Sequence, residues 1–464
     1  MIRIGFNMVF TRDKSFYKSL VRLAVPISLQ NMVSFAVNFA DNLMVGKLGD
    51  SAISGVYMGN QPHTLLFMFV GGTTGAILIL AAQYWGKGDK ASIKKVVSIG
   101  AVFSIVPSVL MSAVCMLFPT QIISVFTSDA RVISEGAAYL FIIGCSYVPF
   151  AISQVLVTSM RGVESAKVGM YISFIALFSN VALNYILIFG KLGFPAMGIR
   201  GAAIATVASR IIELAASITY VFFIDKKLLI KLRDFTILDR LLLRDFIRYG
   251  LPIVGGNVVW SVNMLVNSAI LGRFKEEVIA AASVAGMLSN IVFIWMNGLS
   301  SAVGVITGKT VGAGRYEAMK EYAKTVQVIF LFVGAFSGLV IFLLRDLFIS
   351  FYSISDGARV YASQFVNVLS ITIVGTCYQA TCLFGLVKSG GDISFVFKND
   401  TIFVFGVVLP SAIIAAALGA QPWVVFACLK CDQILKCFVA VVKINRFNWM
   451  KNLTRDAEPA APAT

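Results

Sequence analysis

Charged residues are scarce in this sequence. Asp, Glu, Lys and Arg make up only 13% of its 464 residues, and it contains a single histidine. Hydrophobic residues reach 58%, and the mean hydropathy is +0.84. A soluble protein of this length exposes too much surface to water to accommodate so apolar a chain. The composition therefore excludes an ordinary soluble protein and predicts one that lies mostly in lipid.

Patterns for catalysis and metal binding are also missing. His63 has no metal-ligand partner four residues further on, so we expect it to pack rather than react. Cys428 and Cys431 form a C-x-x-C pair without the second ligand pair that a zinc site needs. The segment "GVITGKT" resembles a phosphate-binding loop, but that motif requires glycine where this chain has Val303. We therefore predict no enzyme activity, no metal and no cofactor.

Long apolar runs, by contrast, follow one another along the chain. A helix of about 20 apolar residues spans the hydrocarbon core of a bilayer. Twelve such helices are predicted, at 21–46, 57–83, 96–118, 136–158, 168–190, 201–223, 250–272, 279–305, 325–344, 361–387, 401–420 and 422–444. The predicted fold class is an all-α polytopic membrane protein.

Basic residues concentrate in alternate connections between these runs, among them 87–95, 226–248, 309–324 and 446–455. This is the positive-inside distribution, and it places both termini in the cytoplasm. The formal net charge of +16 thus follows membrane topology, and we expect no nucleic-acid partner. We expect a monomeric multi-pass protein of a plasma membrane, in the prokaryotic case the cytoplasmic membrane, with lipids around it.

The sequence also repeats itself. "AVPISLQNMVSFAVNFADNLMVGKLG" aligns with "GLPIVGGNVVWSVNMLVNSAILGRFK", so that Pro26 meets Pro252 at an offset of 226. The same offset pairs Asn31 with Asn257, Gly46 with Gly272 and Gly86 with Gly312. After a two-residue insertion, Glu164 meets Asp392. Six helices in each copy make the repeats parallel, related by an axis along the membrane normal.

The repeat predicts the organisation of the chain. Its expected segments are 1–18, a first lobe at 19–223, a linker at 224–249, a second lobe at 250–444 and a tail at 445–464. The linker is basic and amphipathic, so it either lies on the anionic inner leaflet or simply connects the lobes in solvent. Two such bundles can rock and expose a site to each side alternately, which makes transport the leading hypothesis.

One carboxylate interrupts the first apolar run. Asn31, Asn38, Asp41 and Asn42 share roughly one helix face, which must point into a bundle or a wet cavity. The repeat places Asn267 where Asp41 stands, so only the first lobe is charged here. No Lys or Arg lies centrally in the first five helices. Asp41 is therefore a candidate for proton or ion binding, the alternative being a structural carboxylate bonded to amides.

Further polar residues lie in the predicted spans. Asn180 and Asn184 are one helical turn apart, and they either complete a site around Asp41 or join helices by hydrogen bonds. Opposite charges on the last helix of each copy are predicted to pair structurally, with a role in coupling as the alternative. These pairs are Arg210 with Glu213 and Asp432 with Lys436. Side chains that could line a substrate cavity are Asn31, Asn38, Asn257, Asn263, Asn267 and Gln379.

The quoted segments, together with "YWGKGD", "MRGVESAK", "VGAGRYEAM" and "NWMKNLTRD", resemble the multidrug and toxic compound extrusion (MATE) family of secondary transporters over most of the chain. The resemblance implies two six-helix bundles in a V-shape. It also implies export of amphipathic, often cationic organic molecules, coupled to inward flow of H⁺ or Na⁺. The alternatives are a lipid or lipid-linked sugar flippase of a related superfamily, and a receptor or scaffold that transports nothing.

The resemblance also suggests roles for single residues. Asp41 matches the family's first-helix carboxylate, which is implicated in cation coupling. Asn180 resembles its polar partner on the fifth helix, and Asn184 stands where some members have another carboxylate. One branch uses carboxylates on the seventh and tenth helices, where this chain has only uncharged residues. That departure concentrates the expected coupling on Asp41. The uncharged residues of the seventh predicted helix are Asn257, Asn263 and Asn267, and those of the tenth are Cys377, Tyr378 and Gln379.

Overall fold

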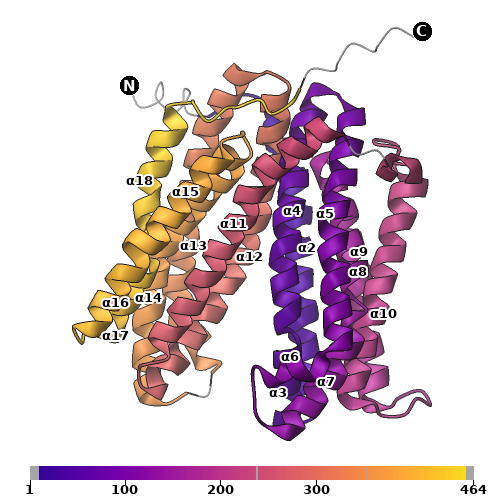
Figure 1. Cartoon of the computed structure of the whole chain (residues 1–464). Helices are drawn as coiled ribbons and strands as arrows, with labels where there is room; N and C mark the ends of the chain where they lie inside the picture. Colours follow the sequence, from indigo (N-terminus) through magenta and orange to yellow (C-terminus); the bar gives the residue numbers. More distant parts are fainter. Residues whose placement is uncertain (1–9, 237–238, 353, 456–464) are drawn as a thin grey trace. The chain divides into compact units, whose positions relative to one another are not determined.

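The computed structural model describes residues 10–236, 239–352 and 354–455, which fold almost entirely into helices (Figure 1). The first half contains α2 (Lys14–Gly46), α3 (Asp50–Gly59), α4 (Gln61–Lys87), α5 (Lys90–Leu117), α6 (Pro119–Ser124), α7 (Ala130–Gly144), α8 (Tyr147–Gly162), α9 (Ala166–Phe189), α10 (Gly198–Thr219) and the π-helix η1 (Tyr220–Ile224). The 3₁₀-helix η2 (Leu232–Thr236) follows. Within these described ranges there is no strand, only an isolated bridge between Gly391 and Met450.

The second half repeats this pattern with more interruptions. It contains α11 (Arg240–Leu271), α12 (Glu276–Gly312), α13 (Tyr316–Ser350), α14 (Asp356–Ala380), the π-helix η3 (Thr381–Lys388), α15 (Ile393–Phe403), the π-helix η4 (Val404–Val408), α16 (Leu409–Ala417), α17 (Pro422–Lys430) and α18 (Asp432–Asn445). The all-α polytopic fold class is confirmed.

Ten continuous helical segments of the described chain are long and apolar enough to cross a membrane, and a bent pair makes an eleventh. That pair is α7 and α8, which meet at 46° at Cys145 and Ser146. The twelfth predicted span, 422–444, is helical but divides at Cys431 into α17 and α18. Lys430 and Asp432 flank this division, so charge interrupts the apolar run there.

Two helices begin earlier than their apolar runs predict. α11 begins at Arg240 rather than 250, because the Asp239 carboxylate caps it by accepting hydrogen bonds from the Leu241 and Leu242 amides at 2.9 and 3.2 Å. The second part of the expected linker is thus the first three turns of a membrane helix. Likewise α2 begins at Lys14, inside the segment expected to precede the first lobe.

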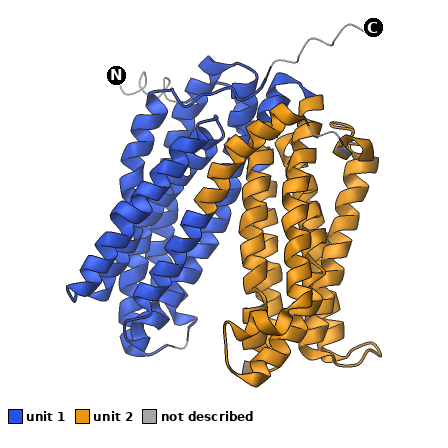
Figure 2. Cartoon of the chain, viewed as in Figure 1, with its two compact units in different colours: residues 1–24, 82–89, 258–464 blue, residues 25–81, 90–257 orange. Residues whose placement is uncertain are grey.

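The chain forms two compact units (Figure 2). Unit 1 contains the described residues of 1–24, 82–89 and 258–464, and unit 2 contains the described residues of 25–81 and 90–257. Each unit is therefore built mainly from one repeat. The division falls within three continuous helices, α2, α4 and α11, whereas the sequence places lobe boundaries in connections.

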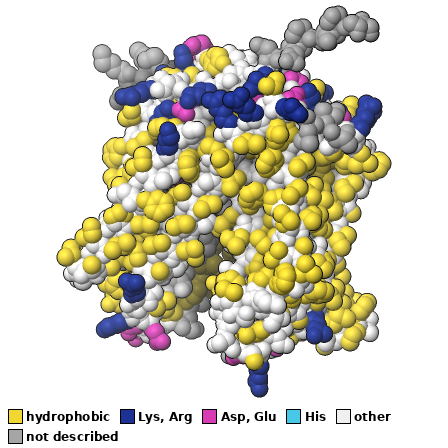
Figure 3. Space-filling model, in the orientation of Figure 1, with side chains coloured by type: hydrophobic (Ala, Val, Ile, Leu, Met, Phe, Trp, Pro, Cys, Tyr) yellow, Lys and Arg dark blue, Asp and Glu magenta, His cyan; other side chains and the backbone are white. Residues whose placement is uncertain are grey.

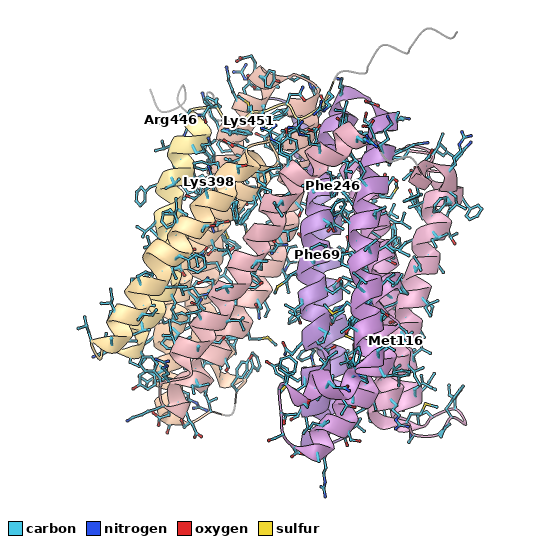
Figure 4. All side chains as sticks on the ribbon, in the orientation of Figure 1. Phe69, Met116, Phe246, Lys398, Arg446 and Lys451 are labelled. Carbon is cyan, nitrogen blue, oxygen red and sulfur yellow. The ribbon has the colours of Figure 1, made fainter. Side chains whose placement is uncertain are left out.

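Contacts inside each unit explain this division. In unit 1, Phe16 of α2 stacks on Tyr322 of α13, with ring centroids 4.5 Å apart. In unit 2, Phe246 of α11 packs against Phe103 of α5 at 5.6 Å between ring centroids (Figure 4). Asn257 of α11 also donates to the Met68 carbonyl at 3.0 Å.

Two glycines that the repeat aligns make reciprocal contacts in unit 1. A Cβ atom at Gly86 of α4 would lie 2.0 Å from the Lys309 carbonyl oxygen of α12. A Cβ atom at Gly312 of α12 would lie 1.9 Å from the Gln83 carbonyl oxygen of α4. Only glycine permits this approach, which explains why both repeats have it at this position.

The C-terminal segment packs on the same end of unit 1. The Gln83 side chain accepts from the Leu453 amide at 2.7 Å and donates to the Lys451 carbonyl at 3.3 Å. Trp449 is fully buried, and Lys451 lies near the end of the described chain in Figure 4. Residues expected to form a simple tail therefore belong to the folded unit.

Charged and apolar side chains separate along each unit. The Lys and Arg side chains on the visible face gather mainly at one end of each unit, and hydrophobic side chains cover most of the remaining visible length (Figure 3). Large exposed apolar residues include Phe178 and Leu265, at 68% and 72%. Such surfaces suit lipid, as expected for an integral membrane protein.

Candidate functional site

A chain of polar side chains crosses the interior of unit 2. The Asn184 side-chain amide on α9 donates a hydrogen bond to the Asp41 carboxylate on α2. It also lies 3.1 Å from the Asn180 side-chain oxygen, and Asn180 donates to the Ser209 hydroxyl of α10 at 3.5 Å. Asn180 and Asn184 are buried, at 1% and 0% exposure, and Asp41 is half-buried. The structure thus brings together the three residues of the predicted coupling site.

An ion pair lies beside this chain. Arg210 and Glu213 of α10 pair at 2.6 Å between Nη1 and Oε2, as their spacing predicts. The Arg210 guanidinium lies over the Phe150 ring, 5.3 Å from its centroid, and is within electrostatic reach of Asp41. Arg210 lies in the sixth predicted span, so the lack of a central Lys or Arg in the first five spans does not exclude a cation near Asp41.

Two further ring side chains lie near the group formed by Asp41 and Arg210. Tyr139 of α7 is 5% exposed, donates to the Asn60 side chain at 3.2 Å and is within electrostatic reach of Asp41. His63 of α4 packs on Phe150 with ring centroids 5.3 Å apart, in agreement with its expected packing role. Sequence reasoning missed Tyr139, which lies within the apolar run predicted at 136–158.

The other asparagines predicted on the face of Asp41 are not part of this chain in the described contacts. Asn38 is exposed and donates to the Ser34 carbonyl of its own helix at 3.2 Å. Asn42 is exposed and donates to the Asn38 carbonyl at 2.9 Å. Asn31 is half-buried. Their role in a substrate cavity stays a prediction.

The asparagines of α11 have different surroundings. Asn257 bonds to the Met68 carbonyl within unit 2. The Oδ1 atoms of Asn263 and Asn267 in unit 1 are buried and accept no hydrogen bond from the described residues. Asn267 is the repeat equivalent of Asp41, and the described contacts give it no counterpart of the Asn184 bond.

Unit 1 has its own buried ionic cluster. Lys436 of α18 pairs with Asp432 at 3.1 Å, as predicted, and also with Asp400 of α15 at 2.9 Å. Gln433 donates to Asp432 at 3.0 Å and accepts from Gln379 of α14 at 2.9 Å. Gln379, predicted to line a substrate cavity, thus belongs to this network. Sequence reasoning missed Asp400, because it lies just before the predicted span at 401.

No group of three or more His, Cys, Asp or Glu side chains that could hold a metal ion is found in the described part of the chain. The hydrogen-bonded group itself offers the oxygens of the Asp41 carboxylate and of two neutral amides, with the Arg210–Glu213 pair beside it. Such a set can accept a proton or bind a hard monovalent cation through oxygen.

Comparison with known proteins supports the repeat and identifies the family. The family model MatE matches the chain twice, over residues 26–186 and 252–414. The two matches begin 226 residues apart and end 228 apart, the same offsets that the sequence repeat has before and after its insertion.

Curated relatives and solved structures agree with this match. The chain is 26% identical to a "Probable multidrug resistance protein NorM" of Thermotoga maritima, over 77% of this chain and 76% of that protein. It is 28% identical to a protein of the same name from Photorhabdus laumondii, over 86% and 87%. A solved outward-facing structure of a multidrug resistance MATE family transporter of the MOP superfamily matches with a TM-score of 0.81. That match has 19% identity and covers 95% of this chain and 99% of the other, which supports the fold. The chain belongs to the MatE family and is an integral membrane transporter.

Proposed function

We propose that this transporter is an antiporter that exports amphipathic, cationic small molecules in exchange for H⁺ or Na⁺. The names of its relatives refer to multidrug resistance, which supports small organic substrates. The basic connections support an orientation with both termini in the cytoplasm of a prokaryotic cell. We expect the transporter to work as a monomer.

The observation that carries this proposal is the Asp41 carboxylate inside α2. A charged side chain at the centre of a spanning helix costs roughly 2.5–3.5 kcal/mol on insertion scales, and Asp41, five residues before the end of α2, carries part of that cost. Its hydrogen-bond donor, Asn184, is neutral and offsets only part of this cost. The Asn184 Oδ1 atom is buried and accepts no hydrogen bond from the described residues, so it offers a second oxygen. A proton or a sodium ion at Asp41 supplies the missing positive charge.

Coupling follows from alternating access. A cation from outside binds Asp41, the packing of α2 against α9 and α10 changes, and the substrate leaves outward. The cation-loaded carrier then opens inward, releases the cation to the cytoplasm and accepts another substrate from the cytoplasm or the inner leaflet. The substrate can shift the equilibrium only by its differential affinity for the two states. Cation and substrate must therefore favour opposite states of the carrier.

Efflux from proteoliposomes tests this proposal. Purified wild type, Asp41→Asn and the control Asp346→Asn are reconstituted with a fluorescent organic cation inside, and a proton or sodium gradient is imposed separately. Asp346 is a suitable control because its carboxylate is 78% exposed near the end of α13. We expect efflux to respond to one gradient, to be lost in Asp41→Asn and to persist in Asp346→Asn.

The same assay separates the alternatives. Normal gradient-driven efflux in Asp41→Asn contradicts the assignment of the coupling site. If several cationic dyes respond to neither gradient, movement of labelled lipid across the bilayer tests for a flippase. A receptor or scaffold moves neither dye nor lipid.

A further inference from the structure

The Arg210 guanidinium lies between two carboxylates in unit 2. It bonds to Glu213 at 2.6 Å through Nη1, and Arg210 directly follows Ser209, which hydrogen bonds through Asn180 and Asn184 connect to Asp41. An arginine has five N–H donors in a planar fork, so one bond to Glu213 leaves donors for a second partner. The Glu213 side chain is 5% exposed and that of Arg210 is 23% exposed. Arg210 can therefore reorient more easily than Glu213.

The charges around Asp41 do not balance. Asp41 and Glu213 contribute two negative charges and Arg210 one positive charge. The other titratable groups facing this cluster are Tyr139 from α7 and His63 from α4. Tyr139 donates to Asn60, and His63 packs among aromatic rings, so both are treated as neutral. One monovalent cation completes the charge balance.

We propose that Arg210 competes with the coupling cation for Asp41, and that Glu213 holds Arg210 aside while the cation is bound. This inference rests on the proposed role of Asp41. When the cation leaves, Arg210 also bonds to Asp41 and shares its single positive charge between the two carboxylates, so neither is left without a charged partner. When the cation returns, Arg210 goes back to Glu213. Arg210 and Glu213 are thus positioning residues that set how tightly Asp41 binds its cation.

If Arg210 competes with the cation, substitutions of Arg210 and of Glu213 should change the cation affinity of Asp41 in opposite directions. Arg210→Gln removes the competitor, so cation binding tightens. Glu213→Gln frees Arg210 to stay on Asp41, so cation binding weakens. An opposite charge near a carboxylate changes its proton affinity by about tenfold to a thousandfold, and we expect shifts at the low end of this range. An ion pair that acts on Asp41 only through fixed charges also predicts opposite shifts for the single variants, but it predicts almost no shift when both charges are removed together.

The test measures gradient-driven efflux from proteoliposomes as a function of pH and, separately, of Na⁺ concentration. For Arg210→Gln we expect half-maximal activity at about tenfold lower cation concentration, and for Glu213→Gln at about tenfold higher. If the cation is a proton, the pH of half-maximal efflux rises in Arg210→Gln and falls in Glu213→Gln. Asp41→Asn is measured in parallel as the test of the underlying site.

A double variant covers the case in which a single variant does not fold. Arg210→Gln with Glu213→Gln removes both charges, which avoids the buried unpaired charge that a single substitution leaves. We expect its midpoint to shift in the same direction as that of Arg210→Gln, because Glu213 acts only through Arg210. No shift, or a shift in the other direction, contradicts the proposal.

The possible results separate a failure of the Arg210 competition from a failure of the coupling role of Asp41. If Asp41→Asn abolishes coupling while Arg210→Gln and Glu213→Gln shift the midpoint in the same direction or not at all, Arg210 does not compete and the antiporter stands. If Asp41→Asn keeps its response to the gradient, the coupling site itself is wrong and the competition fails with it.

Discussion

The two repeats share one fold but bury different chemistry. In the first repeat, Asp41 meets Asn184 and Asn180. In the second repeat the same offsets place Asn267, Val408 and Ala412 at these positions, and the last two are fully buried. The charge of the second repeat lies instead in Lys436 and its two carboxylate partners on α15 and α18. The two repeats thus share a backbone arrangement but have their buried polar groups at different positions.

Close backbone contacts are conserved between the repeats, whereas buried polar contacts are not. Gly86 and Gly312 keep the same residue type because each touches backbone of the other's helix, where no side chain fits. A buried carboxylate has no such constraint and is tolerated only where neighbouring helices supply partners. When Val and Ala replace the α9 amides, a carboxylate on α11 loses those partners, and asparagine stands there instead.

The largest expected effect comes from moving the carboxylate from one repeat to the other. Asp41→Asn combined with Asn267→Asp keeps the number of carboxylates, but Val408 and Ala412 cannot replace the two amides. We expect gradient-driven efflux to stay at the level of protein-free liposomes. Restored efflux in this double variant would mean that the repeats are chemically interchangeable.

The second-largest effect comes from the ionic cluster of unit 1. Lys436→Met leaves Asp400 and Asp432 buried without their shared cation, and we expect a loss of stability of about 3–5 kcal/mol. Thermal unfolding in detergent measures it, with Arg359→Met as control, because Arg359 pairs with Asp356 across an exposed 3.9 Å contact. Similar unfolding temperatures for the two variants would show that the ionic cluster contributes little to stability.

The paired glycines give a smaller effect. Gly312→Ala brings a methyl group against the Gln83 carbonyl, so α4 and α12 must separate, at a cost of about 1–3 kcal/mol. Gly286→Ala is the matched control on the same helix, since nothing lies within 4 Å of its Cβ position. The control should be neutral or slightly stabilising, by roughly 0.5–1 kcal/mol. Equal unfolding midpoints for the two variants would argue against close packing at Gly312.

Much of the fold could be predicted from the sequence, because spans and repeats depend on local composition. The group of Asp41, Asn180 and Asn184 was also predictable, since polar residues in spans are few and helical spacing places the amides on one face. Arg210 beside Asp41 was not, because 169 residues of chain separate them and only tertiary packing decides which helices meet. Asp400 was missed for a related reason. The hydropathy of a segment cannot show that Asp400, at the edge of a predicted span, faces Lys436 on another helix.

The smallest expected effect concerns Asp392, which stands where the first repeat has Glu164. Burial opposes ionisation of Asp392, but Lys443 at 2.7 Å and Lys451 at 2.8 Å outweigh it and lower its pKa. A lowered pKa stabilises the fold above the unfolded-state value and loses this contribution as pH falls through the folded-state value. Asp392→Asn should therefore reduce stability near neutral pH, by about 1 kcal/mol, because the pair with the half-exposed Lys451 contributes little and the asparagine still offers the more buried Lys443 an oxygen acceptor. The unfolding curves of the variant and wild type should converge below about pH 4, whereas a difference independent of pH would assign the effect to packing.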